Sequence, residues 1–589
     1  MTKTIDYYNS NSIKYTSEIS KLYKQLTSLS VARLLVFVVT AVGLYFTFGN
    51  WVVFGGVLIV GSVLFIILLS YYTNIKSTYL LKQELLKINQ EEIRIASGDF
   101  FHKQEGLQFL NSTHNYALDI DLFGRGSFFQ FLDRTATVDG TITLANSLKA
   151  NEIKDITKRQ DAIKELSQKA GWRQQFQATA SLIQVDTEAK AILKFLQSHQ
   201  PFLPQVFKYL PLVVSIATVT IIGLALTKII PLAILGYWIF VGLLITSRYL
   251  KKINMLSANT DKMRDTFRQY AALLHAIENE TFTSKLLLEK QAKINLKDKK
   301  ASTILNELSK AMDALDNRNN LISAIFGNGY FLTDIKHTYT IEQWIDNYKS
   351  TVSHWFEVVS FFDAYNSLGN YAFNHQHYVY PDIVEVNQDT KVNQLGHPLL
   401  HPDKRIDNNF EIKNQQFFII TGANMAGKST FLRTVSLHIV MANVGLPVCA
   451  TSSVYSPVKL ITSMRTSDSL TDDSSYFFSE LTRLKYIVDA IKEDNYFIIL
   501  DEILKGTNST DKAIGSRKFV EKLVSSHATG IIATHDLSLC EIEKELEEVK
   551  NYYFDAQIIN DELYFDYTFK KGVCQNMNAS FLLKKMEIV

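Results

Sequence analysis

One stretch of sequence decides the fold of the C-terminal part of this chain: Phe417-Phe418-Ile419-Ile420-Thr421-Gly422-Ala423-Asn424-Met425-Ala426-Gly427-Lys428-Ser429-Thr430. Four consecutive apolar residues predict a buried strand, and Gly422 to Ser429 follow the pattern G-x-x-x-x-G-K-[ST]. Glycines in such a loop let backbone N–H groups surround phosphate oxygens, while the lysine offsets phosphate charge and the hydroxyl ligates Mg²⁺. The alternative is a chance glycine-rich turn before a helix. We expect a nucleotide-binding loop made of Gly422, Ala423, Asn424, Met425, Ala426, Gly427, Lys428, Ser429 and Thr430.

Two further apolar runs end in residues suited to the same chemistry. Phe497 to Leu500 is followed by Asp501 and Glu502, where a Mg²⁺-binding aspartate and a water-activating glutamate are expected. Gly530 to Thr534 ends at His535, which we interpret as a γ-phosphate sensor, with a structural histidine as the alternative. The predicted catalytic residues are therefore Lys428, Glu502 and His535, and the predicted metal ligands are Ser429 and Asp501.

These segments resemble the MutS family of mismatch-repair ATPases. The phosphate loop of that family reads T-G-P-N-M-G-G-K-S-T, and Thr421 to Thr430 departs from it only at Ala423 and Ala426. Asp501 to Thr507 resembles the D-E-x-x-x-G-T segment of the family, with Lys505 in place of a usual Arg, and Ala533-Thr534-His535 matches its A-T-H. The resemblance implies an α/β ATPase domain of the ABC type that uses ATP and Mg²⁺ and works as a homodimer.

Two other segments are expected at the contact between subunits. Asp472 to Leu481 is similar to the serine-rich signature of the family, and this places Ser475 where the family has the serine that reaches the γ-phosphate of the other subunit. Gly506 to Asp511 forms a small polar loop suited to a contact across a nucleotide, although alone it is only a turn signal.

The resemblance extends more weakly upstream, to about residue 105. Leu122-Phe123-Gly124 and Lys158 to Ile163 look like the opening of the helical MutS core, and Phe362-Asp363-Ala364 and Gly396-His397-Pro398-Leu399 look like its return. Residues 76–200 and 249–370 have the apolar spacing of long helices with charged faces. Only about a hundred residues precede the core, so we expect a variant that lacks the mismatch-recognition domain.

Two pairs of apolar runs predict membrane hairpins. Trp51 to Leu69 is free of charge and follows Leu34 to Phe48, while Tyr209 to Leu226 precedes Ile229 to Thr246, with Pro231 placed in the first turn of its helix. About 20 residues of helix cover a hydrocarbon layer of roughly 30 Å. The plain count is four membrane helices, and the alternative is buried helix pairs in a soluble domain.

Charges at the ends of these runs indicate their orientation. The side of the termini and large domains carries Lys21, Lys24, Arg33, Lys76, Lys82, Lys208, Arg248, Lys251 and Lys252, whereas the other side carries Lys228. Both hairpins should therefore enter from the cytoplasm, which leaves the ATPase and helical domains there. The three cysteines have no metal-ligand spacing, and this agrees with a reducing compartment.

The predicted organisation has six parts. They are an N-terminal cytoplasmic segment 1–30, a first transmembrane hairpin 31–72, a first core region 73–205, a second transmembrane hairpin 206–248, a helical lever and core region 249–390, and the ATPase domain 391–589. The fold class is thus an ABC-type P-loop α/β domain joined to an all-α core and lever with two transmembrane hairpins.

The client of this ATPase is left open between two classes. In the first it is DNA, in repair or recombination near the membrane, as the family resemblance implies. In the second the ATPase rearranges the hairpins and acts on a lipid or protein client. The net charge of +2 does not discriminate, and the basic run from Lys285 to Lys300 fits a solvated helix face, anionic lipid or DNA backbone.

Overall fold

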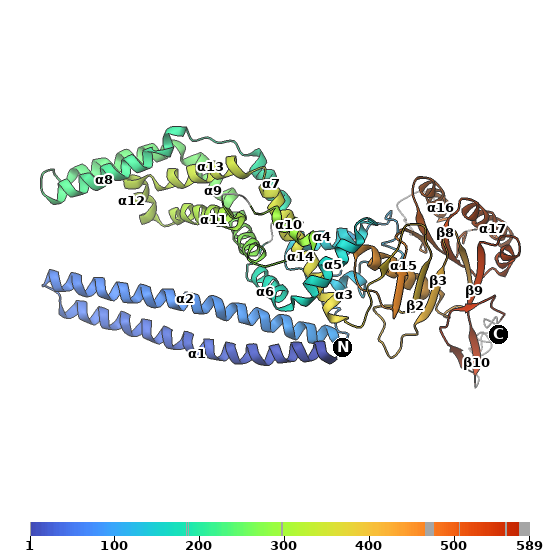
Figure 1. Ribbon diagram of the computed structural model, residues 1–589. Coiled ribbons are helices and arrows are strands. Elements are labelled where there is room, and N and C mark those ends of the chain that lie inside the picture. The colour runs from blue at the N-terminus through green and yellow to red at the C-terminus, as the bar shows by residue number, and fades with distance from the viewer. Residues whose placement is uncertain are drawn as a thin grey trace.

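The computed structural model of the chain describes residues 2–183, 185, 188–295, 299–465, 476–505, 507–559 and 562–575. Figure 1 shows an elongated molecule with a sheet domain at one end, a helical core beside it, and two helical arms that leave the core in the same direction. The described chain is mostly helical, and its sheets lie in the C-terminal part, as the sequence predicts.

The first arm consists of two long antiparallel helices, α1 (Thr2–Phe46) and α2 (Trp51–Ala96). Gly49 takes a φ of +103° in the turn between them, and the Asn50 side chain accepts a hydrogen bond from Val53 N at the start of α2. Each helix is about 70 Å long at 1.5 Å per residue. Both helices run unbroken through the predicted boundaries at 30/31 and 72/73. The composition of the side chains changes at these positions, while the helical backbone continues.

The second arm contains the remaining long apolar helices. Its elements are η2 (Gln205–Lys208), α8 (Leu210–Leu226), α9 (Ala233–Glu278), α11 (Ala301–Asp316), η3 (Asn317–Asn319), α12 (Leu321–Phe331) and α13 (Thr333–Tyr348). Pro231 precedes the first residue of α9, whereas the sequence analysis placed it in the first turn of the helix. The apolar helix α12 was not expected.

The core is built around α14 (Val352–Asn374), which is buried along most of its length. The helices α4 (Val138–Lys149) and α5 (Ile156–Gln168) pack against it. The other core elements are short. In chain order they are η1 (Leu107–Phe109), α3 (Phe128–Leu132), α6 (Ala170–Ser181), α7 (Ala189–Ser198) and α10 (Lys285–Ala292).

The main sheet of the C-terminal domain has six strands in the order β12-β9-β4-β8-β7-β6. Neighbouring strands are parallel except for the β12–β9 pair. The strands are β4 (Phe417–Gly422), β6 (Lys459–Ser463), β7 (Tyr496–Asp501), β8 (Thr529–Ala533), β9 (Val549–Phe554) and β12 (Lys570–Lys571).

Helices cover both faces of this sheet. Phe418 and Ile420 face the side of α15 (Lys428–Val444) and share one apolar cluster with the helical core. Phe417 and Ile419 face the opposite side, where α16 (Tyr476–Glu493) and α17 (Ser509–Ser525) pack. Because alternate residues of a strand point to opposite faces, the fully buried run in β4 reflects a strand covered on both sides.

The rest of the domain consists of smaller elements. A four-stranded sheet has the order β1-β5-β2-β3, and a two-stranded hairpin pairs β10 with β11. Their bounds are β1 (Asp382–Ile383), β2 (Thr390–Leu395), β3 (Asn408–Ile412), β5 (Ser452–Tyr455), β10 (Ala556–Ile559) and β11 (Glu562–Phe565), and η4 spans Leu537–Lys544.

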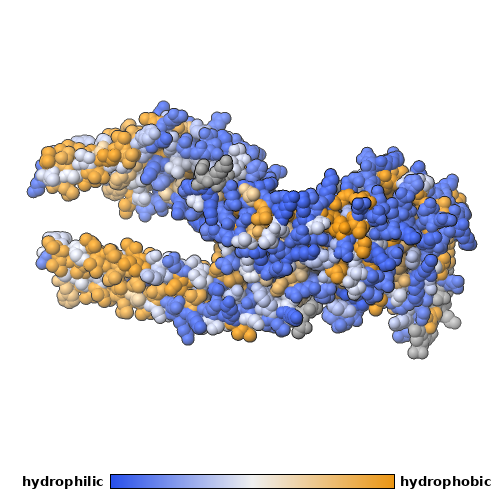
Figure 2. All heavy atoms as spheres, viewed as in Figure 1, coloured by the Kyte–Doolittle hydropathy of each residue, from blue (hydrophilic) through white to orange (hydrophobic). Residues whose placement is uncertain are grey.

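Apolar side chains gather at the ends of both arms. Figure 2 shows these two ends as hydrophobic surfaces facing the same way, while the core and sheet domain are largely hydrophilic on this face. By length and composition, α1, α2 and α9 could each cross a membrane, and α8 and α12 are shorter apolar helices. Val39, Ile59, Val219 and Phe240 are typical of these surfaces, since each keeps about two thirds of its area exposed (68%, 65%, 65% and 65%).

Candidate functional site

The parallel sheet brings the ends of three strands together. β8 lies between β4 and β7, so the residues after these strands meet at one edge. Thr534 N donates a hydrogen bond to Ile420 O at 2.9 Å, and Glu502 N donates to Ala533 O at 2.9 Å. These two bonds continue the backbone hydrogen bonding of the sheet beyond the ends of the strands. They fix the backbone next to His535 and Asp501. Crevices at the carboxyl ends of parallel strands are the usual ligand sites of such sheets.

Two positions in the loop between β4 and α15 require glycine. Gly422 has a φ of +147°, and a Cβ there would lie 2.5 Å from the carbonyl oxygen of Phe554. Gly427 has a φ of +102° immediately before the first residue of α15. Between them Asn424 and Met425 are exposed and Ala426 is buried. The loop therefore turns tightly onto the start of α15, where free backbone N–H groups favour an anion.

Lys428 reaches back over the loop. Its Nζ donates hydrogen bonds to Gly422 O at 2.8 Å and Ala423 O at 3.0 Å, and lies 3.3 Å from Nε2 of His535. Burial lowers the pKa of Lys428, and the negative charges of Asp501 and Glu502 oppose that shift. The ammonium group is thus held by carbonyl oxygens beside two acids, so it can offset the charge of an incoming phosphate.

Ser429 and Asp501 contact one another across the site. The Oγ of Ser429 donates to Oδ2 of Asp501 at 2.7 Å. Ser429 and the adjacent Thr430 are exposed in the first turn of α15. A hydroxyl and a carboxylate are hard oxygen ligands, and Mg²⁺ is commonly held by one or two such protein groups together with substrate phosphates.

Glu502 and His535 form the second contact pair. Nε2 of His535 lies 2.8 Å from Oε1 of Glu502, and Nζ of Lys505 lies 3.7 Å from Oε2. The hydrogen bond from His535 and the charge of Lys505 outweigh partial burial and lower the pKa of Glu502 to about 2. Glu502 also has a φ of +51°, a strained value for a residue with a side chain. Among the predicted catalytic residues, His535 therefore contacts both Lys428 and Glu502.

Glu480 holds the loop that follows Asp501, a role that the sequence analysis did not assign. Its buried carboxylate accepts hydrogen bonds from the backbone N–H groups of Leu504, at 2.5 Å, and Lys505, at 3.1 Å. Glu480 lies in α16, which begins at Tyr476, within the serine-rich segment from Asp472 to Leu481. The sequence placed Glu480 in that segment, but nothing local indicated that it would bind a backbone 24 residues away.

Tyr567 borders the loop between β4 and α15, and Asn408 holds the segment around Tyr567 in place. The amide of the Asn408 side chain donates to Tyr567 O at 3.0 Å, and its oxygen accepts from Phe569 N at 2.8 Å. A Cβ at Gly427 would lie 3.0 Å from the ring of Tyr567.

Part of the expected subunit contact lies outside the described residues. This applies to Ser475 and Gly506. In the described part of the polar loop, the Asn508 side chain accepts a hydrogen bond from Asp511 N at 2.9 Å and caps the start of α17.

The helical core and the sheet domain are joined by the segment around Asp119 and Asp121. Thr462 Oγ1 and the Arg465 backbone N–H both donate to the Asp119 carboxylate, at 2.5 and 2.8 Å. Arg465 and Arg433 form ion pairs with Asp121 at 2.5 and 2.9 Å. Because Thr462 and Arg465 lie at and just beyond the end of β6, the core is fixed to the same edge of the sheet as the site.

A second junction fastens the first arm to the core, and we refer to it as the clasp. It consists of Tyr8, Glu92, Arg134, Arg173, Asn370 and Asn374. Arg134 Nε and Glu92 Oε1 are 2.5 Å apart, and both side chains are buried. Asn370 and Asn374 donate to the Glu92 carboxylate at 3.0 and 2.9 Å, and Tyr8 Oη donates to Asn374 Oδ1 at 2.7 Å. The clasp therefore links α1, α2 and α14.

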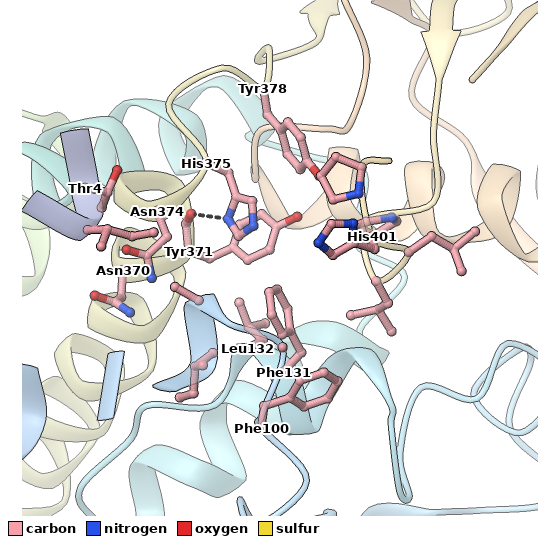
Figure 3. A pocket seen from close by; sticks show the side chains of 18 of the residues that line it. Thr4, Phe100, Phe131, Leu132, Asn370, Tyr371, Asn374, His375, Tyr378 and His401 are labelled. Atoms are coloured by element: carbon pink, nitrogen blue, oxygen red, sulfur yellow. Dashed lines mark hydrogen bonds between the residues drawn. The ribbon is translucent and has the colours of Figure 1, made fainter. Parts of the chain in front are cut away.

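A cavity of about 320 Å³ lies beside the clasp, where the first arm, the core and the sheet domain meet. In Figure 3, Thr4 of α1 lies at the left of the cavity, Phe100 below it, His375 and Tyr378 above it, and His401 of the β2–β3 connection at the right. Burial lowers the pKa of His375 to about 4, and its Nδ1 contacts Tyr371 O at 2.8 Å. The imidazole is therefore neutral, and it is part of the packing of this junction. The residues that line the cavity include none from the loop between β4 and α15.

Three lysines of the basic run from Lys285 to Lys300 contact other residues of the helical part. Nζ of Lys290 lies 4.8 Å from the ring centroid of Phe361, Lys299 pairs with Glu307, and Lys300 Nζ donates to Asn279 Oδ1 at 2.9 Å. Lys297 lies outside the described residues. These contacts favour the interpretation of a helix face that interacts with its own fold.

The fold and the site define a protein whose C-terminal parallel-sheet domain carries a G-x-x-x-x-G-K-[ST] loop with acids and a histidine on the neighbouring strands. Residues 418–585 match the model of MutS domain V. The chain is 33% identical over 223 residues to MutS protein homolog 4 of Homo sapiens, an alignment that covers 36% of this chain and 23% of that protein.

Bacterial relatives give similar figures. The DNA mismatch repair protein MutS of Desulfatibacillum aliphaticivorans is 31% identical over 225 residues, which is 36% of this chain and 25% of the relative. The protein of that name from Staphylococcus aureus is 28% identical over 236 residues, or 39% and 27%. The aligned part thus spans about a quarter of the length of these relatives. The family match and the relatives support MutS family membership through the C-terminal domain.

Proposed function

We propose that the chain binds ATP with Mg²⁺ and hydrolyses it at the site formed by Gly422 to Thr430, Asp501, Glu502 and His535. The observation that carries the proposal is the convergence of Lys428, the Ser429–Asp501 pair and the Glu502–His535 pair at the edge shared by β4, β7 and β8. A chance glycine-rich turn would not bring these residue types into contact.

Each residue has a role that its surroundings allow. The loop from Gly422 to Gly427, where two positions exclude a side chain, would surround the β-phosphate, and Lys428 would offset charge on the β- and γ-phosphates. Ser429 and Asp501 would hold Mg²⁺, which supplies charge neutralisation between the phosphates. Among the described residues no group of three or more His, Cys, Asp or Glu is arranged to hold a metal, and this fits an ion that takes most of its ligands from ATP and water.

Glu502 is the residue that would act on the attacking water. Its low pKa keeps the carboxylate ionised at neutral pH, so it can accept a hydrogen bond from water and orient it in line with the γ-phosphate. In this structure Oε1 of Glu502 contacts His535. A γ-phosphate would compete for the imidazole, and His535 would thereby report its presence to Glu502.

The proposed active form is a homodimer with shared ATP sites. The support is the resemblance, in which the segments of Ser475 and of Gly506 to Asp511 face the nucleotide of the other subunit. Glu480 adds a physical route for such an effect, because it ties the helix that follows Ser475 to the loop after Glu502.

The proposed location is a membrane, with both arms inserted and the ATPase and helical domains on the cytoplasmic side. The support is the pair of apolar ends that face the same way in Figure 2, together with the lysines and arginines at their bases. If this is correct, the protein stays in the membrane pellet after carbonate and high-salt washing, because apolar burial does not depend on ionic strength. Release by salt alone would show a peripheral protein.

Two clients are proposed. The first is DNA, supported by relatives that are named as DNA mismatch repair proteins. The second is the membrane or a protein in it, supported by the clasp, which connects the ATPase side of the core to the first arm. Filter binding of duplex DNA across a salt series separates them. About six phosphate contacts lower affinity roughly a thousandfold between about 50 and about 200 mM salt, whereas no retention at low salt rejects DNA.

A further inference from the structure

The short helix α12, Leu321–Phe331, exposes an unusual amount of apolar surface. It carries no charged residue, and Leu321, Ile322 and Phe326 keep 74%, 69% and 52% of their areas exposed. An 11-residue helix is about 16 Å long, about half of the hydrocarbon thickness. It is therefore too short to cross a bilayer, and contiguous apolar patches of this kind on a soluble surface usually mark an interaction site.

The C-terminal end of α12 packs directly on the apolar part of α9. A Cβ at Gly242 would lie 2.1 Å from the carbonyl oxygen of Gly329, and a Cβ at Gly329 would lie 2.0 Å from Cγ1 of Ile239. Only glycine at these two positions allows the backbones to approach so closely, a packing mode typical of helices in membranes. Because Ile239 and Gly242 fall within the predicted span from Ile229 to Thr246, the end of α12 lies at the same depth as that span.

The polar groups at this contact are satisfied by protein. Thr218 Oγ1 of α8 donates to the carbonyl oxygen of Tyr330 at 2.7 Å and accepts from Trp238 Nε1 at 2.7 Å. Backbone groups at the end of a helix need partners, and hydrocarbon offers none. A water-exposed helix end would not need a threonine from a neighbouring apolar helix.

The turn from α12 into α13 is satisfied in the same way. The buried Asn328 side chain accepts hydrogen bonds from Asp334 N at 2.8 Å and Thr333 Oγ1 at 3.3 Å. The charged side chains lie outside the helix, where Arg318 pairs with Asp334 at 3.3 Å. The irregular backbone at this point therefore meets the condition for non-helical chain at membrane depth, which is burial in protein.

We propose that α12 is a re-entrant membrane segment whose exposed face contacts lipid acyl chains, so the second anchor consists of α8, the start of α9 and α12. The inference rests on the membrane part of the proposed function. The apolar face of α12 is continuous with the exposed apolar faces of α8 and α9 at the end of the second arm (Figure 2). In the chain α11 precedes α12 and α13 follows it, and these two helices pack against one another.

Site-directed quenching in phospholipid vesicles tests this placement. Cys449, Cys540 and Cys574 are buried, so they are replaced by Ala, and retained ATPase activity verifies the background. A bimane label is then attached after Phe326→Cys. The matched aqueous control is Lys310→Cys on the exposed face of α11, and the membrane controls are Val219→Cys on α8 and Ile59→Cys on α2. Quenching by dibrominated phosphatidylcholine is compared with quenching by iodide.

The expected result is several-fold stronger lipid quenching at position 326 than at position 310, at a level close to that of position 219. Iodide quenching at position 326 equal to that at position 310 overturns the inference. So does protection from both quenchers, which would mean that protein covers the helix. If positions 219 and 59 are quenched by lipid in these cases, the membrane proposal stands. If they too are open to iodide, it fails as well.

Discussion

Nε of Arg134 and Oε1 of Glu92 lie 2.5 Å apart in the interior of the protein and join the first arm to the core. Only 3% of the Glu92 side chain and 6% of the Arg134 side chain is exposed. Removing one partner of a buried ion pair leaves an uncompensated charge, so Glu92→Ala should cost about 3 to 5 kcal/mol of unfolding free energy. Denaturant titration of the detergent-solubilised protein, followed by tryptophan fluorescence, measures the change.

A matched control lies on the same arm. Lys82 and Glu18 form a half-buried pair at 2.8 Å, with 27% and 33% of their side chains exposed. Solvent reaches both side chains of this pair and screens their attraction, so Lys82→Ala should cost less than about 1 kcal/mol. Equal losses for Glu92→Ala and Lys82→Ala would contradict the special role of the clasp.

The same pair predicts how stability depends on pH. Burial alone would raise the pKa of Glu92, but the Arg134 charge and the hydrogen bonds from Asn374 and Asn370 hold it below its ordinary value of 4.5. The unfolded state therefore binds the proton first as the pH falls, and the contribution of the pair is present above about pH 4.5 and lost below it. In thermal melts, Glu92→Gln should flatten the acid side of the profile. An unchanged acid side would show that other carboxylates set it.

Hydrolysis and binding should respond differently at two residues of the site. Glu502→Gln keeps the shape of the side chain but removes the proton acceptor, so ATP should still bind while turnover falls roughly 10² or more. Lys428→Ala removes the charge that offsets the phosphates and should weaken binding itself. Equilibrium binding of a fluorescent ATP analogue and phosphate release separate the two effects, and wild-type turnover of Glu502→Gln would reject the assignment.

Glu480 should affect turnover without touching the nucleotide. Glu480→Ala frees the backbone N–H groups of Leu504 and Lys505, so the strained residue Glu502 loses its support. We expect a lower kcat with little change in KM, because the loop between β4 and α15 is not altered. Glu480→Gln retains one acceptor and should recover part of the rate. A rise in KM without a fall in kcat would show that Glu480 acts on binding.

How much of this architecture the sequence predicts depends on whether the signal is local. The loop from Gly422 to Ser429 and the ends of β7 and β8 have residue patterns within ten positions, and the structure brings those residues together as expected. The clasp gives no such signal, because Glu92 and Asn374 are 282 residues apart and meet only through the packing of α2 on the core.

The arms show the same limit in another form. Apolar runs of nearly twenty residues were recognisable as candidate spans, but α12 has only eleven residues and includes Gly327, Asn328 and Gly329. Those residues look like a turn in the sequence, yet Gly329 is needed for close packing on Gly242 and Asn328 caps the next helix. The boundary expected after residue 30 is not visible in the backbone for a related reason. An α-helix continues whether its side chains are polar or apolar, so α1 runs through this position without a break.

The final prediction is that each ATP site is built from two chains. Lys428, Ser429 and Asp501 would serve the nucleotide of their own chain, whereas Ser475 would serve that of the partner. Lys428→Ala and Ser475→Arg should each be inactive alone. In a mixed dimer one composite site carries both defects and the other is intact, so mixing the two inactive proteins should restore part of the phosphate release. Mixing each variant with itself at the same total concentration is the control.

If mixed dimers form, as shown by co-purification through two different tags, and activity stays absent, the sites are not shared or are obligately coupled. A monomeric preparation then decides between these two, because turnover by a single chain would exclude shared sites.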